Sequence, residues 1–121
     1  MAKRILIIDD EPPTVKLLTS RLKKEGYEVF AANDKKSGLK KAQQLQPDLI
    51  FLDVVMPGIS GYEICKLLKS DENTKKSKII VFTNKIEAID ALKARHAGAD
   101  EFLPKLIDPS LLLETVKKMI A

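Results

Sequence analysis

Three runs of four apolar residues mark the chain, and each run ends at a polar side chain. A continuous apolar run of this length is typical of a strand buried on both faces, as in the middle of a parallel sheet. Two shorter or less regular apolar segments also have the composition of strands. We therefore predict five strands, at residues 3–8, 27–32, 48–52, 78–83 and 100–103.

The segments between these strands carry apolar residues at three- and four-residue spacings, which indicate helices with one buried face. Start and stop signals delimit five helices. The first begins at Pro12 and Pro13 and ends at Gly26, and the second begins at a cap at Asn33 or Asp34 and ends before Pro47. The third begins with a Ser60–Glu63 capping box and ends at Asp71, the fourth runs from about Glu87 to His96, and the fifth begins with an Asp108 cap and Pro109 and continues to the last residues. The predicted inward positions are Val15, Leu18 and Leu22; Leu39, Ala42 and Leu45; Ile64, Leu67 and Leu68; Ile89 and Leu92; and Leu112, Val116 and Ile120.

Strands that alternate with helices through short connections favour one architecture. It is a doubly wound α/β fold with a five-stranded parallel sheet, right-handed crossovers and five helices on two faces. The length of 121 residues suits a single domain spanning residues 1–121.

Composition excludes several classes of protein. The net charge of +4 comes from 21 basic and 17 acidic residues that are interleaved along the chain, which argues against direct nucleic-acid binding. There is neither an apolar run long enough to span a membrane nor a signal peptide, and the one cysteine, Cys65, fits a reducing compartment. We expect a cytoplasmic protein with no membrane insertion.

Polar residues gather where the predicted strands end. Asp9 and Asp10 follow the first strand, Asp53 the third, Thr83 closes the fourth and Lys105 lies just past the fifth. Because ligands of open α/β sheets bind at the carboxyl ends of the strands, we expect these five side chains to face one crevice.

The combination of three carboxylates, a lysine and a hydroxyl indicates a specific chemistry. Clustered carboxylates repel one another unless a cation offsets their charge, and hard oxygen ligands at an open site suit Mg²⁺. A lysine and a hydroxyl supply what the oxygens of a transferring phosphoryl group need. Asp53 is therefore a candidate nucleophile toward phosphorus.

These motifs, in this order, resemble those of a response-regulator receiver domain of two-component signalling, of the single-domain kind similar to chemotaxis regulators. The resemblance runs from Arg4 to the last helix. It rests on Ile-Ile-Asp-Asp-Glu at 7–11, Leu-Asp-Val-Val-Met-Pro-Gly at 52–58, Thr83 after a buried strand, and Lys105 after Phe-Leu-Pro. It implies the flavodoxin-like strand order 2-1-3-4-5.

The resemblance also implies a role for each site residue. Asp53 would accept a phosphoryl group from a sensor histidine kinase or a histidine phosphotransfer protein. Lys105 would pair with a phosphoryl oxygen, and Thr83 would move its hydroxyl onto another while Phe102 turns inward. Mg²⁺ would be bound by Asp10, Asp53 and the carbonyl of Val55, with Asp9 acting through water.

By the same resemblance, the chain would be a phosphoprotein of a phosphorelay and not an enzyme, apart from catalysing its own phosphorylation and dephosphorylation. Its output surface would be the fourth helix, the fifth strand and the fifth helix, which would bind a downstream protein target or a second copy of the chain.

The sequence departs from the usual family pattern at Leu106, which replaces a proline that is commonly preceded by a cis peptide. A cis bond before a non-proline residue costs about 2.5–4 kcal/mol, so we predict a trans Lys105–Leu106 bond. Asn84 stands where a small residue is common, and Lys85 follows it. We hypothesise that Asn84 narrows access to the acyl phosphate, that Lys85 alters the approach of water, and that dephosphorylation is slow.

Three alternative functions are compatible with parts of this pattern. A degenerate receiver would act as a constitutive binding module. An aspartyl-phosphate phosphatase would need a second aspartate two residues after the nucleophile, where this chain has Val55. A flavin-binding module would need a neutral loop after the first strand, whereas Asp9, Asp10 and Glu11 would repel the flavin phosphate.

Overall fold

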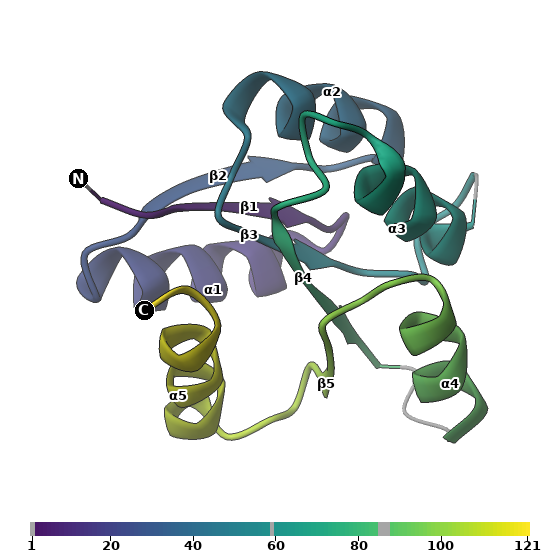
Figure 1. The fold of residues 1–121 in the computed structure, drawn as a ribbon. Helices are drawn as coiled ribbons and strands as arrows, with labels where there is room; N and C mark the ends of the chain where they lie inside the picture. The colour runs from purple at the N-terminus through teal and green to yellow at the C-terminus, as the bar shows by residue number, and fades with distance from the viewer. Residues whose placement is uncertain (1, 59, 85–87) are drawn as a thin grey trace.

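The computed structural model describes residues 2–58, 60–84 and 88–121, without the side chains of residues 88 and 89. Strands and helices alternate along the whole of this part of the chain (Figure 1). They are β1 (Arg4–Ile8), α1 (Pro12–Lys24), β2 (Glu28–Ala32), α2 (Lys35–Leu45), β3 (Leu49–Leu52), α3 (Gly61–Ser70), β4 (Lys78–Thr83), α4 (Ala88–His96), β5 (Glu101–Pro104) and α5 (Pro109–Ile120).

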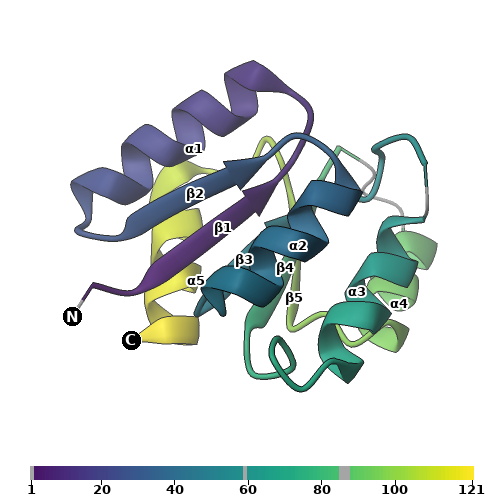
Figure 2. The same cartoon turned by 90° about the horizontal axis from the view of Figure 1, so that it is seen from above.

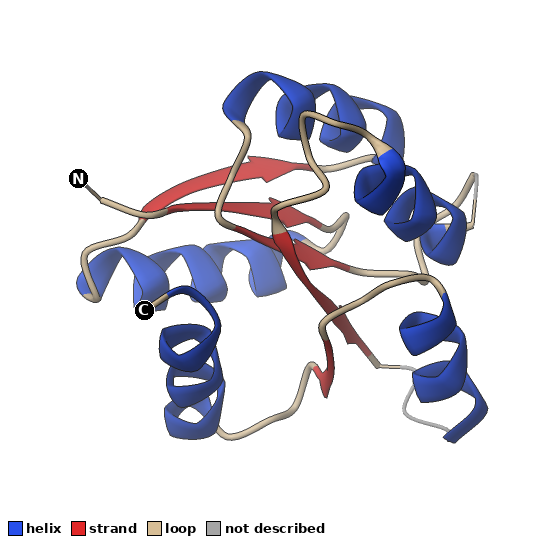
Figure 3. Cartoon of the chain, in the orientation of Figure 1, coloured by secondary structure: helices blue, strands red, loops and turns tan. Residues whose placement is uncertain are grey.

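The five strands form one parallel sheet in the order β2-β1-β3-β4-β5, which confirms the predicted fold class and strand order (Figure 3). The register aligns the strand ends: Ile8 of β1 lies opposite both Ala32 of β2 and Leu52 of β3. All strands therefore deliver the residues that follow them to the same edge of the sheet.

Alternate residues of each strand face opposite sides of the sheet and build two separate cores. Ile5 and Ile7 of β1 pack with Leu18 and Leu22 of α1, in the core that also contains the inner face of α5. Leu6 and Ile8 pack instead in the core that contains α2 and α3. Figures 1 and 2 show α1 and α5 on one face of the sheet and α2 and α3 on the other, with α4 beside α3.

The side-chain caps at Asp34, Ser60 and Asp108 are confirmed, although Ser60 accepts from Tyr62 and not from Glu63 as the predicted capping box would require. Each side chain accepts a hydrogen bond from an amide of the first turn, at 2.8 Å from Ser37, 3.3 Å from Tyr62 and 2.8 Å from Ser110, respectively. These bonds satisfy amides that have no partner within the helix, and so fix where α2, α3 and α5 begin.

Two predicted inward positions are wrong. Leu67 is 41% exposed because the buried stripe of α3 is centred on Ile64, Cys65 and Leu68, and Leu67 lies about a quarter turn from its centre. Leu92 is 51% exposed.

The buried face of α4 is made instead by Asp90 and Ala94, and Leu92 projects from the opposite side of that helix. Three further predictions lie outside the described residues. They are the start of this helix at Glu87, the inward side chain of Ile89 and the position of Lys85.

Candidate functional site

Backbone hydrogen bonds extend the sheet past the strand ends and hold the candidate residues in place. The amide of Asp53 donates to the carbonyl of Ile8 at 3.0 Å, and the amide of Asp9 donates to the carbonyl of Ala32 at 3.1 Å. The amide of Lys105 donates to the carbonyl of Thr83 at 3.0 Å. The ends of all five strands therefore contribute to one edge of the sheet.

The three aspartates lie together, as the sequence predicts. One carboxylate oxygen from each of Asp9, Asp10 and Asp53 lies within 4.8 Å of the other two. Asp9 and Asp53 are buried, whereas Asp10 is exposed, so the cluster opens to solvent on one side. Hard oxygen ligands of this number, at a site that leaves room for water, fit Mg²⁺.

Lys105 reaches into this cluster. Its side chain is only 6% exposed, and its Nζ lies 2.7 Å from Oδ2 of Asp53 and 2.9 Å from Oδ2 of Asp9. The same ammonium also bonds to the carboxylate of Glu11. Burial by itself would lower the pKa of Lys105, but the hydrogen bonds to Asp53, Glu11 and Asp9 outweigh it and raise that pKa, so the group is charged.

The buried carboxylates are fixed by the turns that they occupy. Oδ1 of Asp53 accepts the amide of Val55, and Oδ1 of Asp9 accepts the amide of Glu11, both at 2.9 Å. Each aspartate thus bonds to the amide two residues further on, as in an Asx turn. Burial raises the pKa of Asp9 despite its bonds to Lys105 and Glu11, because the charged carboxylate loses hydration.

The loop after β3 runs close to the start of α3. A Cβ at Gly61 would lie 2.4 Å from Cα of Val54, which no side chain tolerates without movement of the backbone. Gly58 has φ +97°, a conformation that L residues rarely adopt. These two glycines allow the chain to turn directly after Asp53, and Val55 is left 55% exposed beside the carboxylates.

Thr83 and Phe102 lie on the two strands at the β4–β5 end of the sheet. Thr83 is fully buried at the end of β4 and lies opposite Pro104 of β5, the residue before Lys105. Phe102 is partly buried on β5 and lines a hollow with Ala91, Ala94 and Arg95 of α4. Phe102 therefore lies beside α4, three residues before Lys105.

Two charged residues at this edge were not assigned a clear role from the sequence. Glu11 stands at the N-cap position of α1, but its side chain makes no cap bond and instead pairs with Lys105. Lys35 was missed, although a lysine directly after the Asp34 cap is unusual in a first helical turn. It is buried, and its Nζ donates to the carbonyl of Met56 at 2.5 Å.

The segment after Lys105 agrees with the prediction made from Leu106. The Lys105–Leu106 peptide is trans, since the described residues contain no cis bond. Leu106 is 94% exposed, so its side chain takes no part in the core. Lys105 nevertheless reaches Asp53, and the missing proline does not prevent this contact.

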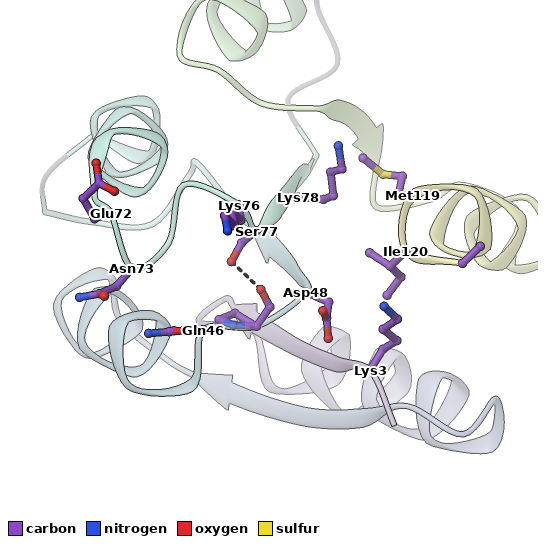
Figure 4. Close-up of a pocket in the computed structure, with 12 residues that line it drawn as sticks. Lys3, Gln46, Asp48, Glu72, Asn73, Lys76, Ser77, Lys78, Met119 and Ile120 are labelled. Carbon is purple, nitrogen blue, oxygen red and sulfur yellow. Dashed lines mark hydrogen bonds between the residues drawn. The ribbon is translucent and has the colours of Figure 1, made fainter. Parts of the chain in front are cut away.

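A second hollow lies at the opposite edge of the sheet (Figure 4). It is lined by Lys3, Asp48 and Lys78, which lie just before or at the start of β1, β3 and β4. It is therefore at the end of the sheet away from the aspartates of the candidate site. Its other polar lining includes Ser77, whose hydroxyl donates to the carbonyl of Pro47 at 2.5 Å. None of the predicted site residues lines this hollow.

Comparison with known proteins gives a consistent result. The model of the response regulator receiver domain family matches residues 5–117. Protein PilH of Pseudomonas aeruginosa is 35% identical over 118 residues, which cover 98% of each chain. The chain spans about half, or less, of the length of several other curated relatives that it matches.

Solved structures of receiver domains and of a chemotaxis protein have the same fold as this chain. Chemotaxis protein CheY4 of Vibrio cholerae superposes with a TM-score of 0.91 at 28% identity, covering 98% of this chain and 99% of that chain. The BeF3-activated receiver domain of DrrB superposes with a TM-score of 0.88, also at 28% identity, covering 98% and 97%. Among the described helices, none has both the length and the apolar character needed to cross a membrane.

Proposed function

The chain belongs to the response regulator receiver domain family, and we propose that it is a phosphorylation-dependent switch with Asp53 as the phosphoacceptor. The observation that best supports this proposal is that charged side chains from several strand ends converge on Asp53. The carboxylates of Asp9 and Asp10 and the ammonium of Lys105 all surround this one buried side chain. Receiver domains are signalling switches and not typical enzymes, and no catalysis on other substrates is proposed.

The proposed reaction is the transfer of one phosphoryl group. A carboxylate oxygen of Asp53 forms a bond to phosphorus while the bond from phosphorus to the imidazole nitrogen of a phosphohistidine breaks. The imidazole nitrogen keeps the electron pair of that bond, and Asp53 becomes an acyl phosphate. The proposed donor is a sensor histidine kinase or a histidine phosphotransfer protein.

The neighbours of Asp53 would support this transfer electrostatically. The ammonium of Lys105 already lies at hydrogen-bond distance from Oδ2 of Asp53, where it would meet a phosphoryl oxygen after the reaction. Asp9, Asp10 and Asp53, with the carbonyl of Val55, would hold Mg²⁺. When bound, the ion supplies positive charge that offsets the repulsion between the carboxylate and the incoming phosphoryl group.

The output would be a population shift on the α4, β5 and α5 side of the molecule. The new phosphoryl group would attract the hydroxyl of Thr83, and Phe102 would then turn further inward. The position of Phe102 beside α4 supports this route, because inward movement would change the surface that it forms with Ala91 and Ala94. A downstream protein target or a second copy of the chain would bind that surface.

The experiment that tests this proposal uses beryllofluoride as a phosphoryl mimic, as in the activated DrrB receiver domain. Amide NMR spectra of the protein are recorded with Mg²⁺ and beryllofluoride. We expect shifts at Asp53 that extend to Thr83 and Phe102, and no such shifts in an Asp53→Asn variant. A spectrum unchanged by beryllofluoride would contradict the proposal and favour a constitutive binding module.

A further inference from the structure

The strongest unexplained feature outside the predicted site residues is the burial of Lys35. This residue is only 3% exposed, and its ammonium donates to the carbonyl of Met56 in the loop after Asp53. Lysines are almost never buried to this extent unless their charge is compensated. Its surroundings must therefore contain negative charge.

Local helix preferences do not account for a lysine at this position. Lys35 is the first residue of α2, and no acidic residue occupies that first turn. The positive end of a helix dipole favours acidic side chains and disfavours lysine. Lys36, next along the chain, shares this turn but is exposed to solvent. Residues outside the helix must therefore stabilise the buried ammonium of Lys35.

The acidic site supplies negative charge near this ammonium, because Met56, whose carbonyl it contacts, lies three residues after Asp53. Loss of hydration lowers the pKa of Lys35, and the carboxylates of Asp53 and Asp10 act in the opposite direction. The ammonium of Lys35 approaches the loop after Asp53 from the start of α2, whereas Lys105 bonds to Asp53 itself from the end of β5. Two lysines from distant parts of the chain therefore lie at the acidic site, one on its carboxylates and the other on the loop that follows Asp53.

We propose that Lys35 is a positioning residue that acts as a built-in counter-charge of the acidic site and weakens the binding of Mg²⁺. This inference rests on the proposed function, since it assumes that Asp10 and Asp53 take up the ion. The physical basis is direct: a fixed positive charge held against the loop that follows Asp53 repels a divalent cation that enters the neighbouring site. The bond to Met56 keeps the ammonium in the loop that follows Asp53.

The test measures the dissociation constant of Mg²⁺ by titration of amide NMR shifts in the unphosphorylated protein. Lys35→Gln removes the charge but keeps a hydrogen-bond donor, and Lys35→Met removes both. We expect the dissociation constant to fall about three- to tenfold in each variant. Since both variants lack the charge, either one tests the proposal if the other fails to fold.

Two control variants distinguish the effect of the lost positive charge from the effect of a disturbed structure. Lys36→Gln makes the same change of charge one residue away, on an exposed side chain, and is expected to alter the dissociation constant less than about twofold, because exposed charges are screened. Lys35→Arg retains the charge and is expected to keep the dissociation constant of the wild type. A merely structural role would make Lys35→Gln and Lys35→Arg behave alike.

The outcomes also distinguish this inference from the proposed function. Equal or weaker Mg²⁺ binding in both Lys35→Gln and Lys35→Met would overturn the role of Lys35 while leaving Asp53 as the phosphoacceptor. Failure of the wild-type protein to bind Mg²⁺ at all would instead overturn the metal site on which the proposed function depends, and with it the inference about Lys35.

Discussion

Nζ of Lys105 lies 2.7 Å from Oδ2 of Asp53, and this contact joins the end of β5 to the end of β3 across the sheet. The same ammonium bonds to Asp9 and Glu11, so one cation serves three carboxylates. If Asp53 is phosphorylated, its own charge is replaced by that of the phosphoryl oxygens. Lys105 would then have to exchange one of its present partners for the new group. This exchange would link phosphorylation to the β5 side of the molecule.

We therefore predict that Lys105→Met slows phosphorylation of Asp53 by acetyl phosphate about 100-fold. The variant keeps a side chain of similar length but loses the donor that would stabilise the phosphoryl oxygens. The rate is followed by intact mass at fixed Mg²⁺ concentration. The matched control is Lys117→Met, which breaks a surface ion pair with Glu25 and leaves the rate unchanged. Equal rates in the Lys105 variant and the wild type would remove Lys105 from the mechanism.

The burial of Asp9 predicts a specific dependence of stability on pH. Its pKa is raised above 3.8 in the folded state, chiefly by loss of hydration. Between pH 3.8 and that raised value, the folded state holds a proton that the unfolded state has released. The contribution of Asp9 to the free energy of unfolding therefore decreases as pH rises through this window.

Asp9→Asn should abolish that decrease. In metal-free solution, the free energies of unfolding of the variant and the wild type are expected to be similar at the acid end of the window. The variant should become the more stable of the two as pH rises, and the difference should then level off. Urea unfolding at a series of pH values measures this. A difference that does not change with pH would contradict the assignment.

Gly61 is predicted to be essential for the loop that follows Asp53. In Gly61→Ala the new methyl group would meet Cα of Val54 at 2.4 Å, and a backbone atom cannot rotate away. We expect a loss of about 2–3 kcal/mol in the free energy of unfolding. Gly38→Ala is the comparison, since the atoms nearest to its new methyl group belong to the side chain of Ile8, at 2.8 Å, and not to the backbone, so it should cost less. The reverse order of the two costs would contradict this account of the loop.

The contact between α3 and α4 gives a further prediction. The hydroxyl of Tyr62 donates to Oδ1 of the buried Asp90 at 3.1 Å. The pKa of Tyr62 is raised to about 12, mainly by burial and secondly by the hydrogen bond to this carboxylate. Tyr62→Phe should lower the free energy of unfolding by about 1 kcal/mol and speed amide exchange in α4. Tyr27→Phe removes a hydroxyl from the opposite core and should leave exchange in α4 unchanged. No change in α4 for Tyr62→Phe would show that the bond does not restrain that helix.

Much of the fold was predictable because its signals are local. The apolar runs of β1, β3 and β4 need no partner to be recognised, and the Asp108–Pro109 pair sets the start of α5. The strand-end residues Asp9, Asp10, Asp53 and Lys105 were brought together correctly because a parallel sheet aligns its strand ends.

The errors and omissions concern residues whose environment is set by distant parts of the chain. Leu92 was predicted to face inward on α4, yet that face belongs to Asp90, which is stabilised there by Tyr62 from α3. Lys35 has no apolar pattern that predicts its burial. Its ammonium is held by the carbonyl of Met56, in the loop that follows β3. Sequence periodicity does not contain this information.

The proposed function depends above all on one claim about the molecule, that Asp53 accepts a phosphoryl group with the help of Mg²⁺. The most direct measurement is the intact mass of the protein after incubation with acetyl phosphate, with and without Mg²⁺, for the wild type and for Asp53→Asn. We predict one added phosphoryl group in the wild type with Mg²⁺, and none in Asp53→Asn or without the ion. An adduct that persists in Asp53→Asn, or no adduct in the wild type, would contradict the claim.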